Sequence, residues 1–325
     1  MQNDPRPTRR QILAVAAAAG LLPRAAWAQA SGYPNRLIEL IVPAGAGGGT
    51  DVLARAFAEA AKKHLPQPIT VNNRPGASGM IGHGEMINAK PDGYRLAIVF
   101  AEIVIVPHLG LTKLSYEDFV PIAQLNADPA AITVKADAPW KTIEEFIAAT
   151  RAKPGEVKMG NSGNGSIWHL AHAALEDKVG VKTNPIPFGG AAPAVLALMG
   201  GHIDAVAVSP GEVATHVQSG KLRTLAVMAD KRLKGFDSVP TLKERGIDLS
   251  IGTWRGLAAP KGTPADVLAV LAEATRKSAD EPLLKEALDR LSMGYSYADA
   301  DTFRANMRRD NELFKTLVNK LGIKG

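Results

Sequence analysis

The fold is decided by two glycine-rich stretches, PAGAGGGTD at residues 43–51 and GNSGNGS at residues 160–166. Each follows an apolar, strand-like run and precedes a helix-like run. A strand, a glycine turn and a helix start together direct unpaired backbone N–H groups and the positive end of a helix dipole at one point, which can hold an anion. Neither stretch contains Lys or Arg. The sequence therefore predicts two uncharged anion-holding loops, an arrangement that suits reversible capture better than chemistry.

The first 28 residues have the features of a secretory signal peptide. Arg6, Arg9 and Arg10 form a basic start, residues 12–22 are apolar and rich in Ala, and Ala26-Trp27-Ala28 is a small-x-small cleavage site. Residues 8–13, TRRQIL, are also typical of a twin-arginine export signal, with the general export route as the alternative. We expect the mature protein to be soluble and to lie outside the cytoplasm.

Composition excludes several classes of protein. The 325-residue chain has a formal net charge of +6 and no Cys. The leader contains four Arg and one Asp, so its removal lowers the charge to +3 and leaves no basic stripe with interleaved aromatics for nucleic acid. Without Cys, the chain has no disulfide framework, thiolate metal site or lipid-modified cysteine. The remaining length of nearly 300 residues fits two medium-sized domains.

Apolar runs alternate with helical patterns along almost the whole chain, which predicts an α/β architecture with mainly parallel sheets. No low-complexity linker separates the halves, so we expect domains joined by crossing strands. The expected strands are residues 37–42, 69–72, 96–100, 131–134, 157–159, 203–208, 222–228 and 254–258, and the expected helices are residues 52–64, 79–88, 143–152, 167–178, 192–200, 265–279 and 302–321. Two further segments, residues 185–188 and 282–291, lie between these elements.

The first loop does not match a phosphate-binding fingerprint. Thr50 stands where a dinucleotide motif needs a third glycine, and no Gly-Lys-Ser/Thr sequence of a P-loop follows. A tight turn that needs positive φ at several glycines is the alternative interpretation. Thr50 and Asp51 also suit helix capping. Three consecutive glycines exceed what one turn requires and would let a ligand touch the backbone.

The second loop allows an enzymatic interpretation as well as a binding one. Residues 160–164 approach the Gly-x-Ser-x-Gly nucleophile elbow but end in Asn164, and Ser162 would need activation by a residue such as His169. His169, His172 and Glu176 could share one helix face as metal ligands, although packing histidines are the commoner case. We favour binding through the Ser162 hydroxyl, the Asn164 amide and backbone N–H groups, with no metal and no cofactor.

Three residues outside the glycine loops have two possible roles. Trp254 and Arg255 could line a cleft, with Arg255 presenting a fork for a carboxylate, or Trp254 could be core and Arg255 solvated. Arg74, in the turn of residues 73–76, could serve a ligand or hold the turn.

A series of short motifs resembles the periplasmic substrate-binding receptors of tripartite tricarboxylate transporters, often called Bug proteins. The likeness runs from Tyr33 to the C-terminus. The motifs keep the family's order and approximate spacing, and they are YPNR at 33–36, IVP at 41–43, GGGTD at 47–51, VNNRPGASG at 71–79, PDGY at 91–94, GNGS at 163–166 with HL at 169–170, GGHID at 200–204, GKLR at 220–223 and VPTL at 239–242.

The resemblance implies a two-domain periplasmic-binding-protein clamshell of the Venus flytrap type, α/β, with crossing hinge strands. Domain 1 would comprise residues 31–127 and 253–325, and domain 2 residues 128–252. In the family, two loops hold one carboxylate of a small organic acid, largely through backbone groups and bridging waters. Carried over, the ligand-binding residues are Ala44, Gly47, Gly48 and Thr50 on one wall, Ser162, Gly163, Asn164 and His169 on the other, and Ala77, Ser78, Phe188 and Gly189 around the rest of the ligand.

Three positions depart from the family pattern. Ala44 replaces an aromatic residue, Phe188 replaces a tyrosine and so removes a hydroxyl, and Glu102 is an acid where small polar residues are commoner. If Glu102 faces the cleft, it would repel a second carboxylate and favour an amine, hydroxyl or amide end on the ligand. A Glu102 side chain turned away from the cleft would count against this hypothesis.

The resemblance implies a monomeric periplasmic receptor, not an enzyme, that delivers a small organic acid to inner-membrane permease subunits. Two alternatives stay open: an exported hydrolase or metal-dependent lyase that acts on an organic acid, and a sensory receptor of the same fold. The sequence leaves the ligand's identity, its affinity and the export route undetermined.

Overall fold

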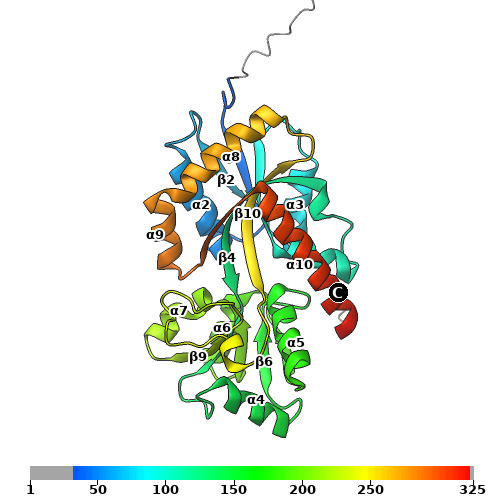
Figure 1. Cartoon of the computed structure of the whole chain (residues 1–325), viewed down its shortest axis with the longest axis vertical. Helices are drawn as coiled ribbons and strands as arrows, with labels where there is room; N and C mark the ends of the chain where they lie inside the picture. Colours follow the sequence, from blue (N-terminus) through cyan, green and yellow to red (C-terminus); the bar gives the residue numbers. More distant parts are fainter. Residues whose placement is uncertain (1–31, 323–325) are drawn as a thin grey trace, which may run out of the picture. The chain divides into compact units, whose positions relative to one another are not determined.

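The computed structural model describes residues 32–322 (Figure 1). The predicted signal peptide lies outside these residues. Contacts between residues group the described chain from Pro34 onward into one compact unit. Within residues 32–322, no helix has the length and apolar character needed to cross a membrane.

The first sheet carries the first glycine loop at the end of its strand β1. Strands β1 and β2 are parallel, as are β1 and β3, whereas β10 is antiparallel to both β3 and β4, and β11 is antiparallel to β4. The strand order is β11-β4-β10-β3-β1-β2. The strands are β1 (Ile38–Val42), β2 (Ile69–Asn73), β3 (Arg95–Phe100), β4 (Phe119–Pro129), β10 (Gly252–Pro260) and β11 (Tyr295–Asp299).

The second sheet carries the second glycine loop at the end of β6. Its order is β7-β6-β8-β5-β9. Strand β6 is parallel to β7 and β8, and β5 is antiparallel to β8 and β9. The strands are β5 (Ala131–Lys135), β6 (Lys158–Asn161), β7 (Asn184–Pro187), β8 (Ala205–Val208) and β9 (Leu222–Val227).

The α/β class is confirmed, but the expectation of mainly parallel sheets is wrong, because both sheets are mixed. The antiparallel pairs come from the strands that pass between the sheets. A parallel neighbour requires a long crossover connection. Strand β5 instead follows β4 after the single residue Ala130, and β10 returns directly from the second sheet to lie beside β4. Periodicity along one strand carries no information about the direction of its neighbours.

The two sheets are joined where the chain crosses between them, near Ala130 and again near Met228 and Ile251. The Ala130 N–H donates to the Ile251 carbonyl at 2.9 Å, the Met228 N–H to the Ala130 carbonyl at 2.7 Å, and the Ile251 N–H to the Met228 carbonyl at 3.0 Å. All three residues are buried. Figure 1 shows the paired strands β4 and β10 running toward the second sheet. The predicted crossing strands are therefore present.

The helices pack around these sheets, nearly all at the predicted positions. Sequence reasoning missed strands β4 and β11 and helix α7, because residues 119–129 contain Gln, Asn, Asp and two Pro, and residues 210–218 begin with Pro-Gly. The α-helices are α2 (Gly49–Ala61), α3 (Met80–Ile87), α4 (Ile143–Ala152), α5 (Ile167–Val179), α6 (Ala191–Met199), α7 (Pro210–Gln218), α8 (Ala265–Asp280), α9 (Pro282–Arg290) and α10 (Ala300–Leu321).

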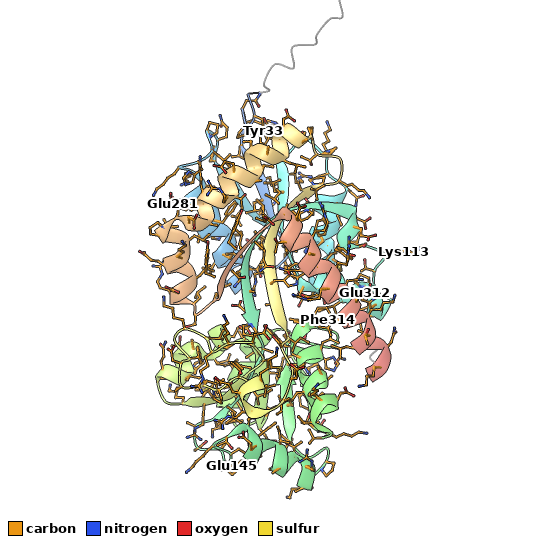
Figure 2. All side chains as sticks on the ribbon, viewed as in Figure 1. Tyr33, Lys113, Glu145, Glu281, Glu312 and Phe314 are labelled. Carbon is orange, nitrogen blue, oxygen red and sulfur yellow. The ribbon has the colours of Figure 1, made fainter. Side chains whose placement is uncertain are left out.

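The crossing strand β10 is fastened to the last long helix, α10. The Trp254 indole is 4 % exposed and stacks edge-on against the Phe303 ring at 5.1 Å between centroids. Its Nε1–H donates to the Asp310 carboxylate at 2.9 Å. Phe314, further along α10, is also buried (Figure 2). Trp254 is therefore a core residue, which settles one of its two possible roles.

Candidate functional site

The first glycine loop is held in place by the carboxylate of Asp51. Its Oδ2 accepts the Gly47 N–H at 2.8 Å and the Arg55 Nε–H at 3.0 Å, and its Oδ1 accepts the Asn73 Nδ2–H at 2.9 Å. Asn73 also donates to the Ala44 carbonyl at 3.1 Å. Burial raises the pKa of the Asp51 carboxyl, but the hydrogen bonds from Arg55, Gly47 and Asn73 lower it overall. The Gly47 N–H is thus already used within the loop.

The N-terminus of helix α2 lies directly beyond this loop. Its N-cap is Gly48, with extended backbone angles (φ −79°, ψ 169°), and no side chain in the described chain caps this helix. Gly48 is exposed, and Thr50 is buried. An uncapped helix start with a glycine cap presents its first N–H groups to a ligand, and the helix dipole favours a negative one. Of the residues predicted for the first loop, Gly48 and the helix start immediately after it are the best placed to hold an anion.

A strained turn at residues 76–79 packs beside the first loop. Ala77 and Ser78 have positive φ (47° and 53°) although neither is glycine, and both are exposed. At Gly79 an added Cβ would lie 2.5 Å from the Phe100 ring and 3.2 Å from the Pro43 carbonyl. Left-handed backbone at ordinary residues costs about 1–3 kcal/mol each and gathers at ligand clamps. The predicted pair Ala77 and Ser78 therefore lies next to the first loop in a conformation typical of a binding turn.

The second glycine loop leaves an unused polar group at its base. Asn161, the last residue of β6, is fully buried, and its Oδ1 accepts the Gly163 N–H at 2.9 Å. Its Nδ2 has no hydrogen-bond partner among the described residues. A buried donor without an acceptor costs about 1–3 kcal/mol, so its partner is expected to be water or a ligand. Sequence reasoning did not include Asn161, which precedes the predicted Ser162, Gly163 and Asn164.

The His169 side chain forms a hydrogen bond with the backbone of its own loop. The Gly165 N–H donates to His169 Nδ1 at 3.0 Å, and the His169 N–H donates to the Ser166 hydroxyl at 3.2 Å, which caps helix α5. Burial lowers the pKa of His169, as does the neighbouring His172. A neutral ring that accepts at Nδ1 carries its proton on Nε2. His169 is therefore a neutral donor rather than a base poised on Ser162.

The remaining predicted residues lie around this loop. Ser162 and Gly163 are half-buried, and Asn164 is exposed. The Phe188 N–H donates to the Asn161 carbonyl at 3.1 Å, and a Cβ added at Gly163 would lie 3.3 Å from the Phe188 carbonyl. Gly189 follows in open space, where an added Cβ would meet no described atom within 4 Å. Phe188 therefore packs against the second loop.

Arg255 joins the first loop to the crossing strands. Its Nε–H donates to the Thr50 hydroxyl at 2.9 Å, and its Nη1 lies 2.7 Å from the Asp128 carboxylate and 2.8 Å from the Asn126 side-chain oxygen. The arginine side chain is only 13 % exposed. Asp128 Oδ1 in turn accepts the Gly294 N–H at 2.7 Å. The solvated alternative for Arg255 is wrong, because strand β10 directs its guanidinium toward β4 and the start of α2.

Glu102, the acid that departs from the family pattern, lies just after β3. It follows β3 in the short helix η2 (Ala101–Val104) and is half-buried. Burial raises the pKa of the Glu102 carboxyl, against the lowering effects of its own backbone N–H, Arg255 and the Ile167 N–H. The side-chain contacts of Arg255 instead join Thr50, at the start of α2, to Asp128 on β4. The hypothesis that Glu102 faces the ligand stays a prediction.

The start of helix α7 also lies here and was missed by sequence reasoning. Ser209 and Glu212 form a capping box, with the Ser209 N–H donating to Glu212 at 2.8 Å. Burial raises the pKa of Glu212 against the lowering effects of Ser209 and Arg255. A Cβ added at Gly211 would lie 2.6 Å from the Leu291 carbonyl, so this helix start touches the chain next to β11. The Ser-Pro-Gly-Glu sequence at 209–212 was the signal that could have located it.

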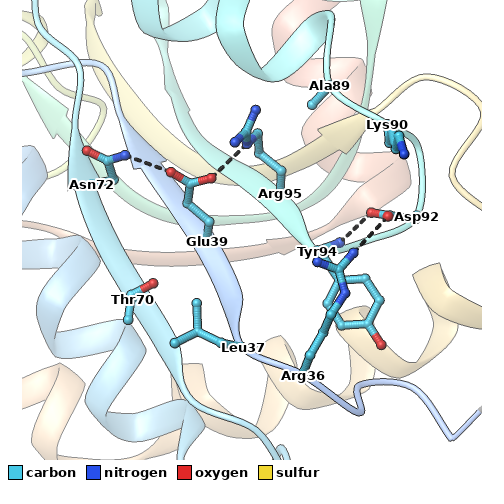
Figure 3. Close-up of a pocket in the computed structure, with 10 residues that line it drawn as sticks. All are labelled: Arg36, Leu37, Glu39, Thr70, Asn72, Ala89, Lys90, Asp92, Tyr94 and Arg95. Carbon is cyan, nitrogen blue, oxygen red and sulfur yellow. Dashed lines mark hydrogen bonds and ion pairs between the residues drawn. The ribbon is translucent and has the colours of Figure 1, made fainter.

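Two cavities lie elsewhere in the described part of the chain. One, of about 570 Å³, lies on the face of β1, β2 and β3 and is lined by charged residues that pair with one another, as in Arg95–Glu39 at 2.7 Å and Arg36–Asp92 at 3.0 Å (Figure 3). The other, of about 610 Å³, lies by the crossing segments and α10, where Asp128, Ile251 and Trp254 are among its lining residues. Neither is lined by the glycine loops, so neither is the predicted site.

The side chains considered as metal ligands form hydrogen bonds within the protein. His172 Nε2 lies beside the Thr183 hydroxyl, and the Glu176 carboxylate accepts the Thr183 hydroxyl at 2.7 Å. Among residues 32–322, no group of three or more His, Asp or Glu side chains is arranged to hold a metal ion. His172 and Glu176 instead fix the turn after α5 to its own helix.

Two mixed sheets, joined by crossing strands and each ending in a glycine loop at a helix start, define an α/β solute-binding protein of the periplasmic-binding-protein class. A family model described as the tripartite tricarboxylate transporter family receptor, TctC, matches residues 53–323. The chain belongs to this family, as the sequence motifs predicted.

Individual relatives agree with this family. BugT of Bordetella pertussis is 31 % identical over 305 residues, which cover 92 % of this chain and 94 % of BugT. A TctC solute-binding protein from Polaromonas, solved without ligand, is 60 % identical, with a TM-score of 0.77 over 89 % of this chain and 99 % of that one. MatC of Rhodopseudomonas palustris, solved with bound malate, is 26 % identical, with a TM-score of 0.77 over 88 % of this chain and all of MatC.

Proposed function

We propose that this protein is a periplasmic receptor that binds a small carboxylate-bearing metabolite between its two glycine loops and delivers it to the permease of a tripartite tricarboxylate-type transporter. It acts as a monomer and performs no covalent chemistry. The signal-peptide pattern of residues 1–28 supports export, and membership of the TctC receptor family supports the transport role. The malate bound to the related MatC supports a carboxylate ligand.

The proposal is supported by the helix start at each glycine loop: the α2 N-terminus has no side-chain cap, and the second loop has the buried Nδ2 of Asn161 without a partner among the described residues. A ligand that bridges the two loops would stabilise the arrangement in which they meet. The absence of Lys and Arg from both loops keeps release feasible, because charge-assisted hydrogen bonds are about twice as strong as neutral ones.

The proposed domains follow the two sheets. Residues 31–127 and 253–325 form the domain that holds the first loop, and residues 128–252 form the domain that holds the second. Because the chain passes between them near Ala130 and Ile251, a small rotation about these crossing segments would open the site without disturbing either sheet.

Thermal-shift measurements with mono-, di- and tricarboxylates, aromatic acids and nicotinamide-like compounds test the function. A ligand at 100 times its Kd stabilises the protein by about 2.7 kcal/mol. Gly48→Val is the informative variant. Its backbone angles suit valine, and the nearest atom to an added Cβ is 3.6 Å away, so the fold should persist while the side chain covers the α2 N-terminus. We expect the variant to lose ligand-induced stabilisation.

The matched control is Gly45→Val, in the same loop, where an added Cβ meets no described atom within 4 Å. It lies three residues before the helix cap and should keep most of the ligand response. An unchanged ligand-dependent shift in Gly48→Val would place the site elsewhere. Turnover of a carboxylic acid by the pure protein, lost in Ser162→Ala, would instead favour an exported hydrolase.

A further inference from the structure

The turn between helix α9 and strand β11, residues 291–294, is fastened firmly to the first sheet. The Gly294 N–H donates to Asp128 Oδ1 at 2.7 Å, and the Gly294 carbonyl accepts the Ala127 N–H at 3.0 Å. Ser292 has a positive φ of 50° although it is not glycine. Such a conformation persists only where the surrounding structure fixes it, and it is common at ligand clamps and switch regions. The 291–294 turn is therefore a rigid part of the first sheet.

One side of this turn lies against the helix that follows the first glycine loop. A Cβ added at Gly49, the first residue of α2, would lie 3.4 Å from the sulfur of Met293. Met293 is 7 % exposed, and its N–H donates to the Leu288 carbonyl of α9 at 2.9 Å. The turn thus lies directly beside the helix start at which we place the ligand.

The other side of the turn meets the start of α7, which follows strand β8 of the second sheet (Figure 1). A Cβ added at Gly211 would lie 2.6 Å from the Leu291 carbonyl oxygen and 3.1 Å from the Ser292 carbonyl oxygen. A real Cβ does not approach a backbone atom this closely, so only glycine permits the contact. Among the described residues, no hydrogen bond joins the turn to α7. The two surfaces can therefore separate without breaking a hydrogen bond.

An ion pair links the same two parts of the molecule. Lys234, which follows β9 of the second sheet, lies 2.8 Å from the carboxylate of Asp289 on α9. The two side chains are 85 % and 56 % exposed, so the pair adds little stability and weakens in salt. These contacts form and separate readily, unlike the buried, hydrogen-bonded crossing segments near Ala130.

We propose that the 291–294 turn is a stop against which the start of α7 closes, and that Gly211 permits this closed contact. The inference rests on the proposed function, because a ligand that bridges the two glycine loops would draw the two sheets together. Rotation about the crossing segments ends when Gly211 reaches the Leu291 carbonyl. The width of the closed site is therefore set by a backbone contact of the protein and not by the ligand alone.

The test uses Gly211→Ala, with Gly84→Ala as the matched control. Gly84 also lies in a helix, α3, and a Cβ added there would meet only Leu114 outside the helix, at 3.5 Å. Because the chain has no Cys, two introduced cysteines can carry spin labels, in place of the exposed Gln218 on α7 and Glu286 on α9. The separation of the labels is measured by electron–electron resonance without ligand and with millimolar malate, succinate or adipate.

We expect the wild type and Gly84→Ala to show the label separation of this structure in at least one of these conditions. Gly211→Ala should lose that separation in favour of a longer one, and its affinity for an acid that the wild type binds should fall at least tenfold. Its melting temperature without ligand should not fall, because alanine is a better helix residue than glycine.

Lys234→Glu is a second test that leaves α7 unchanged. It places a like charge opposite Asp289 and should lengthen the label separation at low salt more than at high salt, whereas Lys231→Glu in the same loop should not. A wild type that never shows the short separation overturns the inference, as does a Gly211→Ala protein that keeps it. If the melting temperature falls while the separation is unchanged, the contact is fixed packing and the inference fails.

Failure of the proposed function would be distinguishable from failure of the stop. If the wild type binds none of the three acids and yet Gly211→Ala loses the short separation, the stop stands and the carboxylate ligand is contradicted. If an acid binds equally well to the wild type and to Gly211→Ala, with equal label separations, the carboxylate ligand stands and the stop is refuted.

Discussion

Replacing Arg255 with methionine tests whether this arginine holds the site together. The change keeps much of the side-chain volume but removes the hydrogen bonds to Thr50, Asn126 and Asp128. Asp128 is 5 % exposed and would keep only the Gly294 N–H at 2.7 Å as a partner. Removing one member of a buried ion pair leaves an uncompensated charge and costs about 3–5 kcal/mol.

This cost should be visible in both stability and binding. At about 2 °C per kcal/mol for a chain of this size, the melting temperature should fall by about 6–10 °C. Thr50 would also lose the contact that holds the start of α2, so carboxylate affinity should fall. Urea denaturation gives the free energy of unfolding, and calorimetry gives the affinity. Arg255→Lys should recover only part of both, because an ammonium cannot reproduce the fork that reaches three partners.

A double variant separates charge from packing. Asn at position 128 keeps an oxygen for the Gly294 N–H but carries no charge. Arg255→Met combined with Asp128→Asn should therefore be more stable than Arg255→Met alone. A loss below about 1 kcal/mol in Arg255→Met, or a double variant as unstable as the sum of its single changes, would refute the idea that a buried charge pair stabilises this site.

Two further predictions concern the core beside the first loop. Burial lowers the pKa of His83 to about 3, below its unfolded value of 6.5, so stability is complete above pH 6.5 and falls as the pH drops toward 3. At pH 5 this loss is about 2 kcal/mol, and His83→Leu should remove it from denaturation curves measured at pH 5 and 7; an unchanged difference would contradict the assignment. Gly79→Ala should destabilise the protein by about 2 kcal/mol or more, because φ is +88° and the new Cβ would collide with Phe100. Gly45→Ala, in open space at ordinary φ, is the control, and equal melting temperatures for the two variants would show that the turn relaxes freely.

Neither glycine loop contains a basic residue, so in the proposed site the open start of α2 would attract one carboxylate through partial positive charge from the backbone, without binding it too strongly.

Sequence alone was sufficient for the features that depend on local backbone chemistry. Glycine runs between strand-like and helix-like segments predicted both loops and the helices that follow them. These features depend on residues that are neighbours in the sequence, because glycine permits positive φ and has no side chain to cap a helix. The order of the motifs predicted the family and the crossing strands. The strand directions were predicted wrongly, because pairing depends on partners far away along the chain.

Only the tertiary structure decided which groups meet at the site and which are already used. Arg255 contacts Thr50 across 205 residues of sequence and Asp128 across 127. Hydrophobic periodicity carries no information about contacts between residues so far apart in the sequence. From the sequence alone, a solvated Arg255 was therefore an equally good interpretation. The Gly47 N–H looked available but is bound to Asp51, whereas Asn161, which was not among the predicted site residues, keeps a buried donor without a partner among the described residues. A polar group forms its hydrogen bond with whatever partner folding brings near it. The composition of a loop therefore shows which groups could bind a ligand, but not which of them are already bound within the protein.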